Sequence, residues 1–161
     1  MEQGMEYRQQ IIEGYKQTVM PLLRYLPWFE RNAGRAASSV YGGDNISAHS
    51  VSFPVYDSTV MSFVKEASKT SLMDKNYAYV YTRNRIRNHD DERKLIQRAG
   101  WKEWNILCGI LSKYVMGGMT RATLWNEAVK EDIFYLVLKQ MREIIEFWDK
   151  PLDIEGERAE R

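Results

Sequence analysis

The stretch Trp104-Asn105-Ile106-Leu107-Cys108-Gly109-Ile110-Leu111-Ser112-Lys113-Tyr114-Val115 decides the fold. Its apolar residues recur every three or four positions, which places them on one face of a helix. This face consists of Trp104, Leu107, Cys108, Leu111 and Val115. Further apolar side chains flank it, so the helix belongs in a core, and the pair Gly117-Gly118 ends it.

The same apolar periodicity predicts helices on both sides of this stretch. They cover residues 5–19, 21–31, 57–72, 90–99, 120–130 and 132–148. The last two can be one continuous helix. Pro21 is expected to break the hydrogen-bond ladder or to open a new helix, while Pro27 allows a second start. Asp57 is expected to be an N-cap, and so is Asp90 or Asp91.

Two segments are harder to assign from the pattern. Tyr77, Tyr79 and Tyr81 alternate as in a strand, but no turn signal closes residues 76–88, and we favour helix there. In the polar insert at about 32–54, Gly42-Gly43 lies between short β-leaning runs, with 51–53 as the partner run. That arrangement fits either a small β-hairpin or a loop.

These elements predict a mainly α fold. Residues 1–150 are expected to form a single compact domain of about six helices, with the hairpin or loop inserted at about 32–54. Residues 151–161 are a charged tail, which we predict to be disordered.

Composition excludes several classes of protein. With 44% hydrophobic residues the chain as a whole is not disordered, and a net charge of +1 argues against a generally basic nucleic-acid coat and an acidic DNA mimic. The low net charge does not exclude a local basic patch. The single Cys108 excludes an intrachain disulfide and a multi-cysteine zinc site. We see neither a signal peptide nor a long apolar run, so a cytoplasmic protein without a membrane span is expected.

No motif in the chain carries recognisable catalytic chemistry. Cys108 is expected to be a core thiol, since it lies on the apolar face of its helix. The quartet 89–92, His-Asp-Asp-Glu, supplies too few ligands on one face for a metal, and its acids suit the first turn of a helix. Phosphate-binding, dinucleotide and nucleophile-elbow motifs are missing. We therefore predict no catalytic residue, no metal and no cofactor, and keep an enzyme with a dispersed site as a third hypothesis.

The most suggestive segment is the arginine-rich stretch 83–98, which follows three tyrosines. Arginine and aromatic side chains are enriched at protein interfaces, and both also bind nucleic acid. The simplest alternative is a solvated face whose arginines pair with Asp90, Asp91 and Glu92. The tryptophans are expected to lie in the core, with Trp101 or Trp125 as the one most exposed. The predicted partner-binding residues are Tyr79, Tyr81, Arg83, Arg85, Arg87, Arg93, Lys94, Trp101 and Trp125.

Several packing and turn motifs resemble a family of small bacterial proteins of unknown function. These are the run 51–57 (VSFPVYD), the segment 72–77 (LMDKNY), the early 22–30 (LLRYLPWFE) and the later 124–128 (LWNEA). The resemblance spans about residues 20–145. Proteins of that family are common in Firmicutes and often lie on phages and other mobile elements. It implies a bacterial, intracellular, mobile-element context and no reaction, because the family has no assigned catalytic residues.

We expect a non-catalytic interaction protein that binds and regulates or inhibits another protein. Its sharpest form is a phage or mobile-element inhibitor of a bacterial defence system, similar to an anti-CRISPR protein, with a host defence complex as partner. The alternative is a nucleic-acid-binding helical module that uses residues 83–98, including Arg98.

Overall fold

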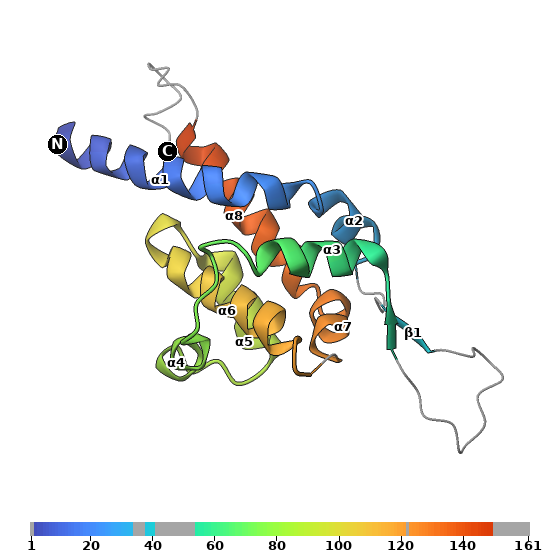
Figure 1. Ribbon diagram of the computed structural model, residues 1–161. Coiled ribbons are helices and arrows are strands. Elements are labelled where there is room, and N and C mark those ends of the chain that lie inside the picture. The colour runs from blue at the N-terminus through green and yellow to red at the C-terminus, as the bar shows by residue number, and fades with distance from the viewer. Residues whose placement is uncertain (1, 34–37, 41–53, 122, 150–161) are drawn as a thin grey trace.

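The computed structural model describes residues 2–33, 38–40, 54–121 and 123–149, and this part of the chain is mainly helical (Figure 1). It contains eight α-helices and a short 3-10 helix, η2. Their bounds are α1 (Glu2–Leu23), α2 (Leu26–Arg31), α3 (Ser58–Ala67), α4 (Tyr77–Arg83), α5 (His89–Arg98), η2 (Trp101–Glu103), α6 (Trp104–Gly117), α7 (Thr123–Lys130) and α8 (Ile133–Asp149). None of the described helices combines the length and apolar character needed to cross a membrane.

The mainly α prediction is confirmed, but there are more helices than the expected six or so. The segments at 120–130 and 132–148 form two helices, α7 and α8, and not one continuous helix. Asp132 lies between them with φ of 63°, a left-handed conformation that ends the regular helix geometry. The short helices α2 and α4 lie within the predicted helical ranges 21–31 and 76–88, and their apolar residues Leu26, Phe29 and Val80 are buried by their neighbours.

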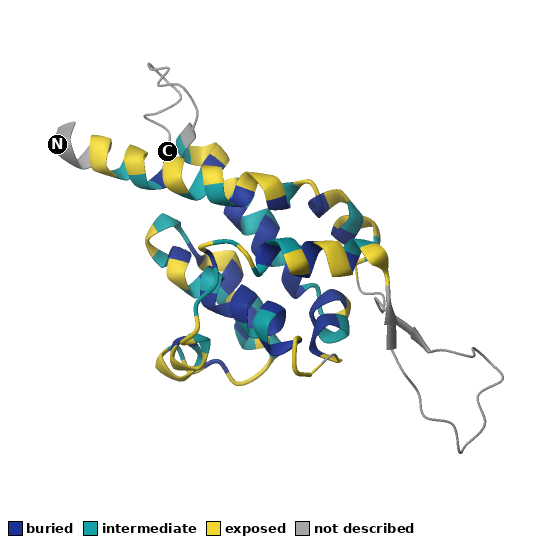
Figure 2. Cartoon of the chain, viewed as in Figure 1, coloured by how far each residue is buried: buried dark blue, intermediate teal, exposed yellow. Residues whose placement is uncertain are grey.

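Helix α6 is the centre of the core, as its sequence predicts. Leu107, Ile110 and Leu111 are fully buried, and Figure 2 shows dark blue residues along the length of α6. Helices α4, α5, α7 and α8 all contact it. Helix α1 contacts α8 and adds a stacked pair, in which the rings of Tyr15 and Trp104 are parallel with centroids 4.0 Å apart.

A cluster of aromatic rings joins α2 and α3 to α8. Phe29, Phe63 and Phe134 are each buried, and their ring centroids are 4.9 to 5.6 Å apart. Edge-on ring contacts of this kind add to the free energy gained from burying apolar area. This cluster fixes where α3 lies, and α3 forms one side of a groove described below.

The helix ends confirm some of the expected signals and contradict others. Asp57 caps α3, with its Oδ1 accepting a hydrogen bond from the Thr59 amide at 2.7 Å. The prediction for Pro21 was wrong, because α1 continues through it to Leu23. Helix α3 ends at Ala67, earlier than residue 72, and a series of turns follows it.

An antiparallel pair of short strands is found in part where a hairpin was considered. β1 (Ser38–Val40) pairs with β2 (Pro54–Tyr56), with Ser39 opposite Val55. The strands therefore lie at the ends of the predicted insert. The expected turn at Gly42-Gly43 and the expected partner run 51–53 lie outside the described residues, as does the tail 151–161.

Candidate functional site

The chain between α4 and α5 forms a compact turn, residues 83–88, which we call the arginine turn. Arg85 has φ of 55°, the left-handed conformation that reverses the chain. The Ile86 amide donates to the Tyr81 carbonyl at 3.0 Å, and the Ile86 side chain is buried. The Arg87 amide donates to Asp91 Oδ2 at 2.9 Å. Backbone hydrogen bonds and a buried anchor thus hold this turn in one shape.

A buried carboxylate lies beneath the arginine turn. Glu92 is only 1% exposed, on the inner face of α5. Tyr81 Oη donates to its Oε2 at 2.5 Å, and Tyr114 Oη lies 2.7 and 2.9 Å from its two oxygens. His89 Nδ1 is 2.7 Å from Oε1. The carboxylate is therefore surrounded by donors from α4, α5 and α6, which is the condition for tolerating a buried charge.

His89 extends this network to α7. Its Nε2 lies 2.8 Å from Glu127 Oε1, so the ring bridges two carboxylates. Lys113 Nζ, 3.8 Å from Glu92 Oε2, adds a positive charge. The hollow beside these residues has a volume of about 160 Å³ and is lined mainly by polar side chains. The two carboxylates contact opposite nitrogens of the ring, and no group of three potential metal ligands converges in the described chain.

Burial and the charge of Glu92 raise the pKa of Tyr81 and of Tyr114 well above the ordinary tyrosine value. Both hydroxyls therefore stay protonated near neutral pH and remain donors to the carboxylate. The hydrogen-bond donors around Glu92 are side chains of the protein: Tyr81, His89 and Tyr114. The arrangement ties α4, α5 and α6 together and holds the arginine turn above it.

At the N-terminus of α5, the capping residue and the position of Glu92 differ from the sequence prediction for residues 89–92. Asn88 is the N-cap, with Oδ1 accepting from the Asp91 amide at 2.8 Å, so neither Asp90 nor Asp91 is the cap. Asp90 and Asp91 do occupy the first turn, as expected. Glu92 instead points into the core, because Tyr81 and Tyr114 supply hydroxyl donors there.

The expected neutralisation of the arginines by these acids is found only for Arg93. Its guanidinium binds Asp90 at 2.8 Å and Glu131 at 3.2 Å. Three other arginines, Arg83, Arg85 and Arg87, are exposed and have no side-chain ion pair with any described residue. Lys94 and Arg98 are exposed on α5.

The two tyrosines of α4 singled out from the sequence have opposite environments. Tyr79 is 55% exposed, and together with Thr82 and Arg83 it borders a shallow hollow. Tyr81 faces the core, with its hydroxyl bound to Glu92 and Lys113 Nζ 4.5 Å above its ring. Tyr79 is therefore accessible to a partner and the Tyr81 hydroxyl is already engaged.

The two tryptophans predicted to be most exposed are not alike. Trp101 is partly buried in η2, where it borders a hollow with Phe147 and Trp148 of α8. Trp125 is only 8% exposed, which contradicts the prediction for it, and its Nε1 donates to the Val115 carbonyl at 3.2 Å. Packing of α7 on α6 turns this ring inward, and one edge of it borders a surface groove.

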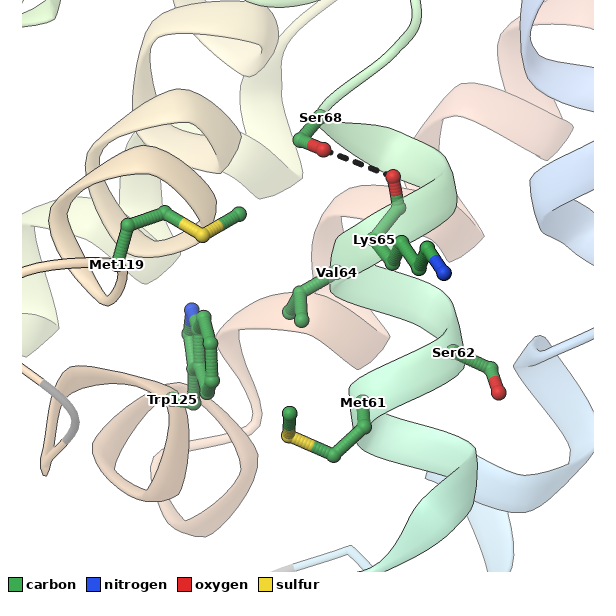
Figure 3. A pocket seen from close by; sticks show the side chains of 7 residues that line it. All are labelled: Met61, Ser62, Val64, Lys65, Ser68, Met119 and Trp125. Carbon is green, nitrogen blue, oxygen red and sulfur yellow. Dashed lines mark hydrogen bonds between the residues drawn. The ribbon is translucent and has the colours of Figure 1, made fainter.

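This groove lies between α3 and the region around α7, and we call it the Trp125 groove (Figure 3). Met61 on α3 is 44% exposed and Met119, after α6, is 52% exposed. Figure 3 shows Met61 and Val64 pointing towards the Trp125 ring, whereas Lys65 points away from it. The groove has a volume of about 340 Å³, and its lining residues are Met61, Ser62, Val64, Lys65, Ser68, Met119 and Trp125.

Sequence reasoning singled out Trp125 but not Met61. An exposed methionine on the outer face of a helix has no periodic signature of its own. Met61 lines the same groove as Met119 and Trp125 only in the folded chain, where the aromatic cluster packs α3 against α8, which is a tertiary effect.

Cys108 lies partly buried on α6. Burial, with a smaller contribution from the charge of Asp74, raises the pKa of the Cys108 thiol to about 12. A thiol of that pKa is almost entirely protonated at neutral pH and is a poor nucleophile.

Comparison of the chain with models of known protein families, with curated proteins and with solved structures finds no match.

Proposed function

We propose that this protein is a non-catalytic module that binds another protein through the Trp125 groove. The observation that supports this is the pair of half-exposed methionines, Met61 and Met119, which flank the buried Trp125 over an open and mainly apolar hollow. The occupant is an apolar side chain presented by the partner protein. Large apolar side chains left in water at one place are typical of interaction sites.

The energetics of the groove favour binding. Trp125 is held by its hydrogen bond to Val115, so its ring needs no reordering when a partner arrives. Methionine side chains are flexible and polarisable, and they adapt to the shape of an inserted group. Burying their exposed surface contributes roughly 25 cal/mol for each Å² of apolar area removed from water.

The lining of the groove supports recognition and not bond chemistry. Lys65 is the one ionisable residue among the described residues that line it, and Figure 3 shows its side chain pointing away from the ring. An acid–base pair or an activated nucleophile needs at least two such groups within hydrogen-bond reach. The groove thus offers an apolar surface to a partner.

The test is a comparison of partner capture by matched methionine variants. The tagged protein, M61D/M119D and M20D are expressed in a bacterial host, and captured proteins are identified after cross-linking. Met20 is a suitable control, since it is 50% exposed on α1 and does not line the groove. Circular dichroism and urea unfolding confirm that all three fold.

The expected result is a partner retained by the parent and by M20D and lost with M61D/M119D. Charged side chains in the groove cost free energy to desolvate against an apolar partner. A partner retained equally by M61D/M119D, or a partner lost equally with M20D, contradicts the proposal. The same is true if no protein is captured by the parent.

The narrower form of the proposal makes the partner a bacterial defence complex. It is supported by the resemblance of several sequence motifs to proteins of phages and mobile elements. In that case, expression of the parent protein raises plaque counts of a phage targeted by a CRISPR system, and M61D/M119D does not. Equal plaque counts with and without the protein contradict this narrower form. Binding of another protein by the groove is then still tested by the capture experiment.

A further inference from the structure

The arginine turn is a second candidate site, and we propose that it binds single-stranded nucleic acid together with Tyr79. This site lies on α4 and the turn after it, whereas the Trp125 groove lies between α3 and α7. The inference is independent of the proposed function.

The arginine turn carries exposed positive charge that favours binding of a phosphate backbone. Overall the chain carries a net charge of only +1, but its acids near the turn are already engaged. Glu92 is buried with Lys113 Nζ 3.8 Å from its Oε2, Asp90 binds Arg93, and the Asp91 carboxylate accepts a hydrogen bond from the Arg87 amide. The positive charges of Arg83, Arg85 and Arg87 therefore face solvent without side-chain ion pairs in the described part of the chain. A local excess of unpaired guanidinium groups is what a phosphate backbone requires.

The backbone of the arginine turn is held in one shape. The Ile86 side chain is buried, and the amides of Ile86 and Arg87 donate to Tyr81 and Asp91. The network around Glu92 supports the turn from below. Guanidinium groups on a fixed backbone lose less conformational entropy on binding than those on a flexible loop.

Arg85 is an unusual residue type for its backbone conformation. Its φ of 55° suits glycine or asparagine, and an arginine there is strained. Neither the turn nor the core uses the Arg85 side chain, which is exposed. A strained residue whose side chain serves no packing purpose points to a role for that side chain at the surface.

Tyr79 supplies the feature that favours a single strand over an acidic protein. Its ring is 55% exposed, one helical turn before Arg83, and borders a shallow hollow with Thr82 and Arg83. A nucleobase can stack on a lone aromatic ring beside a guanidinium group. Thr82 and Arg83, the other described residues that border this hollow, place a hydroxyl and a guanidinium group beside the ring, where they can hydrogen-bond a stacked nucleotide.

The test measures the anisotropy of a fluorescein-labelled oligothymidylate of twelve nucleotides with the full chain. Three phosphate contacts predict an affinity that falls roughly 20-fold between 50 and 200 mM salt, from a slope of about −0.7 for each contact on a single strand. R83A/R85A/R87A is expected to lose at least tenfold in affinity at 50 mM salt and most of the salt dependence. The matched control R31A/R121A/K130A removes three exposed cations elsewhere and is expected to bind within about threefold of the parent.

A second arm tests stacking and a third separates nucleic acid from acidic protein. Y79A is expected to lose about fivefold or more in affinity while the salt slope stays the same, since the ring makes no ionic contact. A labelled polyglutamate peptide of equal charge is expected to bind at least tenfold more weakly than the oligonucleotide. M61D/M119D is expected to bind as the parent does, which keeps a failure here distinct from a failure of the groove proposal.

Several results overturn the inference. One is a parent protein that does not bind the oligonucleotide at 50 mM salt. Another is equal loss of affinity in R83A/R85A/R87A and in the control variant. A third is polyglutamate that binds as tightly as the oligonucleotide does. That result assigns the arginine turn to an acidic protein partner and overturns the nucleic-acid proposal.

Discussion

Glu92 on α5 and Tyr114 on α6 form a buried contact, with the tyrosine Oη 2.7 and 2.9 Å from the two carboxylate oxygens. Both residues lie away from solvent, and the Tyr81 hydroxyl donates a further hydrogen bond from α4. This contact connects three helices and supports the arginine turn. Disruption of this contact should therefore lower the free energy of unfolding.

Glu92→Gln tests the buried contact. The amide keeps the size of the carboxylate, but its NH₂ group faces hydroxyl donors, so some buried polar groups lose their partners. We expect a loss of about 2–4 kcal/mol in the free energy of unfolding, measured by urea titration. Glu146→Gln on the exposed side of α8 serves as the control and should leave the midpoint unchanged. A Glu92→Gln midpoint equal to that of the parent would show that the carboxylate is dispensable.

Cys108 should react slowly in the native protein. Its thiol pKa is raised to about 12 from an ordinary value of 9.0, so the native state holds roughly a thousandfold less thiolate at pH 8 than the unfolded chain. Reaction with a disulfide reagent, followed by absorbance, should be at least a hundredfold slower in buffer than in 6 M guanidinium chloride. Similar rates in the two solutions would argue against burial of this thiol.

Stability should decline at alkaline pH. The pKa values of Cys108, Tyr81 and Tyr114 are all raised in the native state, so the native state retains protons that the unfolded chain releases near pH 9 to 10. Their contribution is complete below that range and is lost as pH rises through it and beyond. Urea midpoints at pH 7, 8, 9 and 10 should fall above pH 8, and Tyr81→Phe should reduce the fall. A midpoint that stays constant to pH 10 contradicts this account.

The contact of α4 with α6 depends on Gly109. A Cβ atom placed there would lie 2.8 Å from the side-chain atoms of Val80, closer than such atoms approach. Gly109→Ala should therefore destabilise the protein by about 1–3 kcal/mol in thermal or urea unfolding. Val80→Ala/Gly109→Ala should recover part of that loss relative to the sum of the single changes. Strictly additive single changes would mean that the two residues are not in contact.

Arg85→Gly separates the backbone of the arginine turn from its charge. Glycine relieves the left-handed strain, worth about 1–2 kcal/mol, while its greater freedom in the unfolded chain offsets about 0.4–1 kcal/mol. We expect the free energy of unfolding to stay equal or to rise by up to about 1.6 kcal/mol in urea titration, even though a side chain is removed. A drop of more than 1 kcal/mol would show that the Arg85 side chain contributes to folding.

Much of the fold could be predicted from local patterns. The apolar face of residues 104–115, the glycine pair after it and the Asp57 cap each depend on neighbours within one or two helical turns, and the structure confirms all three. Pro21 was predicted wrongly because local geometry alone disfavours a helix there. Packing of Val19 and Leu22 in the core holds α1 together through it.

The candidate site was only partly predictable. The exposure of the arginines followed from their polarity, but their lack of ion pairs did not, since Glu92 looked like a surface acid beside them. The exposure of Trp125 was not predictable from the sequence either, because the packing of α7 on α6 buries this side chain.

By itself, the sequence determined a mainly helical chain, the positions of most helices and a surface rich in arginine near residue 85. Only the tertiary structure decided that Glu92 is buried and that Met61, Met119 and Trp125 line one groove. It also decided that Arg83, Arg85 and Arg87 have no side-chain ion pair among the residues that the structure describes. The physical reason is the separation along the sequence of the residues that interact. Helix periodicity and caps are set within a few residues, whereas the partners of Glu92 come from 11 and 22 residues away and depend on how the helices pack.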